Sequence, residues 1–443
     1  MNKAIVGRLK EIKQIRVVGK QLKGTLRFFL RFAKRKPFLF FHSPGIAFVK
    51  AKKRPSSIAG KIDQTLLDGL TFHQDVIVYP LGPGKHLDFS GGLVDSKSRQ
   101  LVREAIHARV VLCQECPTSD DLQVLDADIP EIGHLVLFGG ILFNNFGHFL
   151  LESLSRLWAY EYVRELDPYI FFYEDMGKSN YLEKRNFINQ VFTGFNIPLK
   201  RIFFLDRITK IKNILIPSQK YGYEFCRQPD NIFLRFMHSF KFPRLIPKGF
   251  EKSNKIYVSR SKMPYGFGKL MGEELFEDYL RLNGYNIFHP EFYSLYEQLT
   301  VYSRTTKIIF CDGAALHGCI LLPQLESAVA VIARRRHPQW KFKEITDQFQ
   351  GYGKKVLWID EVLKQYQFGL ESWSAITLID WYKISNLLKV EGFVDSAFEN
   401  FNGIDYTDLI RTEIFNHIQS INRNSEFIEF MMKQDETGLK SFS

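Results

Sequence analysis

Short apolar runs alternate with longer amphipathic stretches along most of this chain, and this alternation limits its fold more than any other feature. The apolar runs at 135–138, 169–173 and 202–205 predict buried strands, and residues 149–164 predict a helix with one apolar face. Strands that alternate with helices pair into mainly parallel sheets. Because 443 residues exceed one ordinary core, we expect an α/β protein of two to three domains.

The alternation is most regular in the second half of the chain. There the pattern predicts strands at 255–259, 285–288, 307–311 and 328–333, with helices at 273–282 and 295–303. This order is Rossmann-like, because the chain passes repeatedly through one sheet. The less regular stretch at 217–252 is expected to be a linker or insertion, and the Pro and Gly residues at 80–84 predict a loop.

The ends of these predicted strands carry a set of residues suited to a phosphorylated ligand. Ligands of open parallel sheets bind outside the carboxyl ends of the strands. Arginine offers phosphate a fork of donors, and the backbone amides of a tight turn that opens a helix add more. The residues that follow the four strands are Arg260-Ser261, His289-Pro290, Asp312-Gly313-Ala314-Ala315 and Arg334-Arg335.

A second constellation lies at the start of the helix predicted at 149–164. His148 and Glu152 are four residues apart and would share one helix face, with Asn144 or Asn145 as the N-cap. A carboxylate beside an imidazole fixes its tautomer and raises its basicity, as a general base requires. A capped helix with a surface His–Glu pair explains the same spacing, so both interpretations stay open.

The positive charge of the chain is concentrated at its beginning. Residues 1–54 hold 16 lysines and arginines and a single acid, Glu11, so this segment has a net charge of +15, whereas the whole chain has +12. Apolar residues at a spacing of three or four predict a basic amphipathic helix on an anionic membrane surface through residues 1–36, or else a solvated arm. The remainder has no basic face interleaved with aromatics, so nucleic acid is not an expected partner.

No apolar run is long enough for a membrane span or a signal peptide, so we expect a cytoplasmic protein at the inner face of a plasma membrane. Five cysteines argue against a disulfide framework, and the lone pair Cys113 and Cys116 is expected to be ordinary thiols. Asp126 and Asp128 form a short acidic triplet outside the phosphate-binding half. No metal site is expected there.

Three ordered motifs resemble glycosyltransferase family 61. They are GHFLLE at 147–152, YVSR at 257–260 and DGAALHG at 312–318, and the likeness covers roughly residues 130–395. That family groups bacterial capsule and cell-envelope enzymes with plant xylosyltransferases and eukaryotic O-linked N-acetylglucosamine transferases. The resemblance implies the GT-B fold, in which two Rossmann-like domains face a cleft. It also implies that a nucleotide sugar binds the carboxyl-terminal domain and reacts with inversion.

The resemblance and the strand-end geometry together assign roles to individual residues. His148 with Glu152 is the expected base for an acceptor hydroxyl, and no cofactor or divalent metal is expected. Two departures from the family pattern bear on the donor: Lys269 replaces a second arginine, and Asp312 stands where His or Gly is usual. The residues expected to bind the nucleotide sugar are Ser259, Arg260, Lys269, Glu297, Gly313, Ala314, Ala315 and His317.

These expectations divide the chain and define its function. The predicted parts are a membrane-associating tail (1–54), an acceptor-side domain (55–216), a linker (217–252), a donor-side domain (253–395) and a helical extension (396–443). The predicted activity is transfer of a sugar to a hydroxyl of a glycan or glycolipid in capsule or surface polysaccharide synthesis. A polysaccharide pyruvyltransferase-like enzyme and a non-catalytic membrane-associated scaffold remain as alternatives.

Overall fold

The computed structural model describes eleven segments, all within the compact unit Ala51–Ser443. In the described part, no helix is both long and apolar enough to span a membrane. The predicted amphipathic tail, the Cys113–Cys116 pair and the Asp126–Asp128 triplet lie outside the described residues. The segments are 68–83, 89–108, 114–115, 129–175, 186–222, 229–252, 254–336, 345–349, 352–366, 374–398 and 406–420.

The first sheet is mixed, although four of the six strand pairs among its described residues are parallel. It has the strand order β3-β2-β1-β7-β4-β5-β6. β7, β4, β5 and β6 run parallel, whereas β1 pairs antiparallel with both β2 and β7. The expectation of a mainly parallel sheet therefore holds for β4, β5, β6 and β7, and the antiparallel pairs of β1 depart from it. The strands are β1 (Leu70–Pro83), β2 (Phe89–Asp95), β3 (Gln114–Glu115), β4 (Glu131–Leu142), β5 (Tyr169–Glu174), β6 (Ile202–Phe203) and β7 (Thr209–Pro217).

The antiparallel part was missed because β1 contains residues typical of turns. Pro80, Gly82 and Pro83 belong to this strand instead of the predicted loop, and the β1–β2 register shifts between Tyr79 and Gly82. Proline is tolerated at such irregularities because it need not donate to the ladder. The Gly139-Gly140 pair likewise lies inside β4, which continues beyond the predicted end at residue 138.

The single helix predicted at 149–164 is broken into short turns. A polar side chain competes for one of its backbone groups, because the Ser155 hydroxyl donates to Glu152 O, and the Ser153 hydroxyl ties the segment to β4 by accepting from Phe143 N. Periodicity of apolar residues does not reveal this competition. The pieces are α3 (Phe146–His148), the π turn η4 (Phe149–Ser153), η5 (Leu157–Ala159), α4 (Tyr160–Val163) and η6 (Arg164–Leu166).

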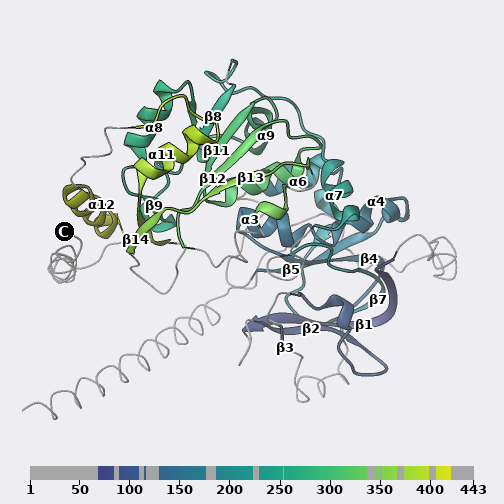
Figure 1. Ribbon diagram of the computed structural model, residues 1–443. Coiled ribbons are helices and arrows are strands. Elements are labelled where there is room, and N and C mark those ends of the chain that lie inside the picture. Colours follow the sequence, from purple (N-terminus) through teal and green to yellow (C-terminus); the bar gives the residue numbers. More distant parts are fainter. Residues whose placement is uncertain are drawn as a thin grey trace, which may run out of the picture. The chain divides into compact units, whose positions relative to one another are not determined.

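The second sheet confirms the prediction for the second half of the chain, since all of its strand pairs are parallel. Alternate side chains enter different cores: Ile308 and Phe310 face one, Ile309 and Cys311 the other. Helices therefore cover both faces, with α8 (Glu273–Leu282) and α11 (Trp381–Val390) on the second core (Figure 1). The order is β10 (Asn286–Phe288), β8 (Lys255–Val258), β11 (Lys307–Cys311), β12 (Ala328–Ile332), β13 (Val356–Ile359).

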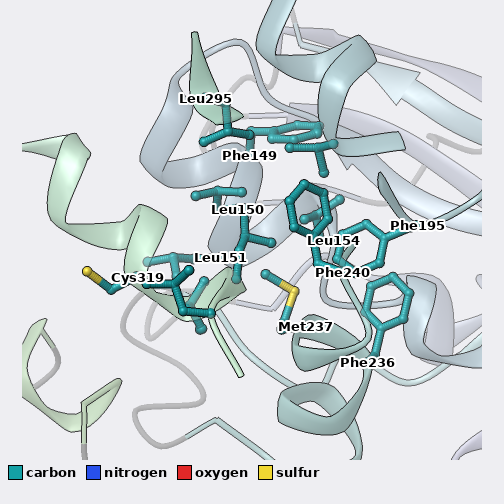
Figure 2. Packing of buried hydrophobic residues seen from close by; sticks show 14 of the residues in the cluster. Phe149, Leu150, Leu151, Leu154, Phe195, Phe236, Met237, Phe240, Leu295 and Cys319 are labelled. Atoms are coloured by element: carbon teal, nitrogen blue, oxygen red, sulfur yellow. The ribbon is translucent and has the colours of Figure 1, made fainter. Parts of the chain in front are cut away.

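A single hydrophobic core joins elements of both sheets. Phe149 and Leu150 of η4 share it with Leu295 of α9 (Leu295–Tyr302) and Cys319 of η10 (Ala314–Leu321), as Figure 2 shows. Hydrogen bonds reinforce it, because Gln190 of α6 (Asn186–Gly194) accepts from Leu295 N at 3.0 Å. The carboxyl ends of β4 and β11, to which η4 and η10 are attached, are thereby held together.

The stretch predicted as a linker contributes to this core. It contains α7 (Asn231–His238), whose Phe233, Phe236 and Met237 are buried. The linker prediction overlooked these apolar residues because prolines and arginines surround them. The remaining elements are η2 (Arg103–Ala105), η7 (Leu199–Arg201), η8 (Tyr265–Phe267), η9 (Pro290–Phe292), α12 (Tyr406–Ser420) and a small sheet of β14 (Val362–Tyr366), β15 (Ile376–Ile379) and β9 (Lys269–Leu270).

Candidate active site

His148 is positioned by a capped turn at the end of β4. The Asn145 side chain accepts from Gly147 N at 3.0 Å and from His148 N at 3.4 Å, which makes Asn145 the N-cap. The π turn that follows buries the Glu152 side chain completely, whereas 37 % of the His148 side chain stays exposed. π turns in helices are frequent at functional sites. The sequence prediction of a His–Glu pair thus corresponds to a half-buried imidazole on a buried carboxylate.

The Glu152 carboxylate accepts hydrogen bonds from two imidazoles. Its Oε1 atom lies 2.5 Å from His148 Nδ1, and its Oε2 atom lies 2.8 Å from His107 Nε2. A carboxylate only accepts, so His148 carries a proton on Nδ1 and a lone pair on Nε2. The Phe143 ring packs against both imidazoles, at centroid distances of 5.3 Å and 5.7 Å. His107 was not among the predicted residues.

Two side chains hold the segment that carries His107. Arg156 is buried and donates to the carbonyl oxygens of Glu104 at 2.7 Å and Ile106 at 2.8 Å, as well as to Pro217 O at the end of β7. Burial lowers the pKa of Arg156 to about 10, which leaves it charged at neutral pH. On the other side of His107, Gln219 bonds both the N–H and the carbonyl of Ala108.

The carboxyl end of β8 rests on a buried carboxylate. Glu273 Oε1 accepts from the Tyr257 hydroxyl and from Arg260 N, each at 2.8 Å. The Ser259 hydroxyl is fully buried between Glu273 at 3.0 Å and Glu277 at 2.7 Å. Burial raises the pKa of Glu273. Ser259 therefore supports the strand end, and the Arg260 side chain extends beyond it.

Arg260 lies directly on the glycine turn predicted to receive phosphate. A β-carbon on Gly313 would sit 2.6 Å from Arg260 Nη1, so any side chain there would force this guanidinium to shift. Nη2 donates to Phe267 O at 2.8 Å, and Nε has no hydrogen-bond partner among the described residues. Ala314 and Ala315 begin η10 immediately afterwards. Arg260, Gly313, Ala314 and Ala315 thus come together as predicted.

Asp312 has its own cationic neighbours at the same edge. Its carboxylate lies 3.8 Å from Arg335 Nε, and its carbonyl accepts from Arg334 Nε at 3.3 Å. Burial, with Arg260 nearby, lowers the pKa of Arg334 to about 10, so it stays charged at neutral pH. Arg260, Arg334 and Arg335 together outweigh the one carboxylate. Lys269 donates from Nζ to Ser261 O at 2.7 Å, beside this edge.

His317 joins the two groups of residues. A β-carbon on Gly147 would lie 2.9 Å from His317 Cδ2, which places this ring against the turn that carries His148. The charge of Asp312 raises the pKa of His317, and the nearby His148 lowers it. Glu297, by contrast, forms a capping box with Ser294 at the start of α9, and its carboxylate accepts from Ser294 N and Oγ. The structure therefore assigns Glu297 a helix-capping contact.

The arrangement brings an imidazole with a carboxylate partner close to a cationic strand edge. The first can take a proton, and the second can stabilise a leaving phosphate. Within the described segments, no group of three or more His, Cys, Asp or Glu residues is arranged to hold a metal ion.

Comparison with known proteins agrees with this chemistry. No curated protein shows a match to the chain. Residues 146–329 match the family model Glycosyltransferase 61. The match begins at the turn that carries His148, spans β8 and the Gly313 turn, and ends in β12. Residues 146–329 are thus a glycosyltransferase family 61 domain, and the chain is a glycosyltransferase, an enzyme that transfers a sugar to an acceptor.

Proposed function

We propose that this enzyme transfers a sugar from a nucleotide-sugar donor to a hydroxyl of a glycan or glycolipid acceptor, with inversion at the anomeric carbon. The observation that carries the proposal is the hydrogen bond of His148 Nδ1 to the buried Glu152 carboxylate. Nε2 takes the acceptor proton while the acceptor oxygen bonds to C1 of the sugar. The imidazolium that forms is stabilised by the carboxylate.

The electron pair of the broken C1–O bond leaves with the nucleoside diphosphate. Arg260 and Arg334 stand at the strand edge where this charge develops, with Lys269 beside them. The backbone amides that follow Gly313 supply further donors. Asp312 is compatible with this role because Arg335 lies 3.8 Å from its carboxylate.

The GT-B arrangement is part of the proposal, with the donor on the β8–β13 sheet and the acceptor on the β4 side. The all-parallel second sheet and the parallel strands β7, β4, β5 and β6 of the first support it. We place the enzyme on the inner face of a bacterial plasma membrane, in capsule or surface polysaccharide synthesis. The net charge of +15 over residues 1–54 supports that location.

A calorimetric titration against UDP-, GDP- and ADP-sugars tests the function. We expect one donor to bind at micromolar concentration, and His148→Ala to keep that affinity while turnover falls at least about a hundredfold. His134→Ala is the control, because His134 is exposed on β4. Full turnover by His148→Ala would place the base elsewhere. Binding of phosphoenolpyruvate alone would favour the pyruvyltransferase alternative.

The membrane location has its own test. Removal of residues 1–36 should weaken sedimentation with vesicles rich in phosphatidylserine, and salt should weaken it for the full chain. Turnover of a soluble acceptor should change little. Unaltered sedimentation of the shortened chain would exclude this segment as the membrane contact.

A further inference from the structure

The hydrogen bonds of Gln348 determine the tautomer of His317. Gln348 Nε2 donates to Ile345 O at 2.8 Å, and because a carbonyl oxygen can only accept, the orientation of the amide is determined. Its Oε1 atom therefore faces His317 Nδ1, at 3.1 Å. An amide oxygen also only accepts, so Nδ1 carries the proton. The other ring nitrogen, Nε2, is left with a lone pair.

The same ring stays neutral at physiological pH. Burial is the largest cause that lowers the pKa of His317, to about 4, and the nearby His148 lowers it further. The Gln348 hydrogen bond and the Asp312 charge oppose this shift but do not reverse it. A neutral ring with a lone pair on Nε2 offers phosphate neither a charge nor a proton. It does accept a hydrogen bond from a hydroxyl group.

The position of the ring indicates which hydroxyl it meets. His317 follows Gly313 by four residues of 3₁₀ geometry, about 8 Å along η10 from the turn where Arg260 lies. Its Nε2 edge faces α3, since a β-carbon on Gly147 would lie 3.5 Å from Nε2. His317 thus lies between the cationic edge and His148. In the proposed reaction the transferred sugar lies beside this ring, between the leaving diphosphate and the acceptor.

We infer that His317 Nε2 accepts a hydrogen bond from a hydroxyl of the transferred sugar and does not contact the diphosphate. This inference rests on the proposed nucleotide-sugar donor. It gives the enzyme a residue that selects the donor sugar, separate from the arginines that bind the leaving group. Gly147 helps to position His317, because any side chain at residue 147 would displace the imidazole ring.

Calorimetry on the full chain tests the inference with UDP, GDP and ADP and with their sugars. His317→Ala should bind the matching nucleotide sugar about five- to tenfold more weakly, as loss of one hydrogen bond predicts, and the nucleoside diphosphate within twofold of the wild type. His317→Gln, which can place an acceptor oxygen where Nε2 lies, should lose less than threefold. His134→Ala should change neither affinity.

The outcomes separate this inference from the proposed function. An equal loss for sugar and diphosphate would mean a phosphate contact and would overturn the inference, as would no loss for either. A wild type that binds no nucleotide sugar would overturn the proposed function instead. Long-range ¹H–¹⁵N spectra of histidine-labelled protein, without any donor, should show the His317 ring protonated at Nδ1. Protonation at Nε2 would overturn the inference whatever the donor.

Discussion

His107 Nε2 lies 2.8 Å from Glu152 Oε2, on the oxygen that His148 does not use. The contact joins two buried side chains 45 positions apart, and His107 precedes the matched family domain. A hydrogen bond to a carboxylate stabilises its charged form. His107 therefore orients the Glu152 carboxylate by holding its Oε2 atom, and through this carboxylate it positions His148, the proposed base.

Replacement of His107 should alter the pH dependence of the reaction. Without its hydrogen bond, the Glu152–His148 pair takes up a proton at higher pH, because its unprotonated form loses a donor. For His107→Phe we expect the acidic limb of the kcat/KM profile to move up by about one pH unit, and kcat to fall about tenfold. The donor KM should stay within twofold.

His107→Gln is the matched variant, because its amide can donate from the position of Nε2. It should restore most of kcat and return the acidic limb towards that of the wild type. A profile that is identical for wild type and both variants would limit His107 to packing against Phe143.

The second half of the fold could be predicted from sequence closely. The structure places β11 at Lys307–Cys311 and α8 at Glu273–Leu282, each with the predicted bounds. Strands of a parallel sheet are short continuous apolar runs, whereas apolar residues that recur every 3.6 positions mark the helices that connect them. The sequence also predicted that Arg260 and the Gly313 turn lie together, because the carboxyl ends of parallel strands meet at the same edge of the sheet.

The first half resisted prediction for physical reasons. β1 carries two prolines and one glycine around a register shift, so its sequence resembles a loop. Ser153 and Arg156 lie in an apolar helical pattern but bond to distant backbone groups, and the segment folds as short turns instead of one helix. No local pattern marks His107. Its role depends on a contact with Glu152 that only the folded chain creates.

Gly313 should tolerate no side chain without loss of nucleotide affinity. A methyl group there meets Arg260 Nη1 at 2.6 Å, so the guanidinium must shift from its position on the turn. We expect Gly313→Ala to bind the nucleoside diphosphate at least about tenfold more weakly, since hydrogen bonds to charged groups are the strong ones. Calorimetry measures this directly.

Gly318→Ala, in the same helix, is the control for that substitution. The nearest atom to its added methyl group is 3.7 Å away, an ordinary contact. Its affinity should stay within twofold of the wild type. Equal binding by Gly313→Ala and wild type would remove Arg260 from the diphosphate site.

Glu273 should prove necessary for both stability and donor binding. Glu273→Ala leaves the Tyr257 hydroxyl and Arg260 N without their acceptor, and each buried donor left unsatisfied costs about 1–3 kcal/mol. Denaturant unfolding should show that loss, and nucleotide affinity should fall because Arg260 is no longer held.

The neighbouring Glu274 provides the contrast. It is exposed and pairs with Lys262 at 2.7 Å, so Glu274→Ala should cost no more than about 1 kcal/mol. Nucleotide affinity should be unchanged. Similar losses for both variants would mean that Glu273 has no special part in holding Arg260.

The neutral state of the partly buried His317 ring should make stability depend on pH. In the unfolded chain its ordinary pKa is 6.5, whereas the folded value is about 4. As the pH falls from 7 to 5, the unfolded chain gains a proton that the folded protein resists, so the free energy of unfolding decreases. Linkage gives about 2 kcal/mol for this group over that interval. His317→Gln cannot titrate and should lack this part of the decrease, while His238 and His289 titrate equally in both proteins. Urea unfolding at pH 7 and pH 5 measures the difference, and parallel losses in the two proteins would show that the ring takes a proton in the folded state.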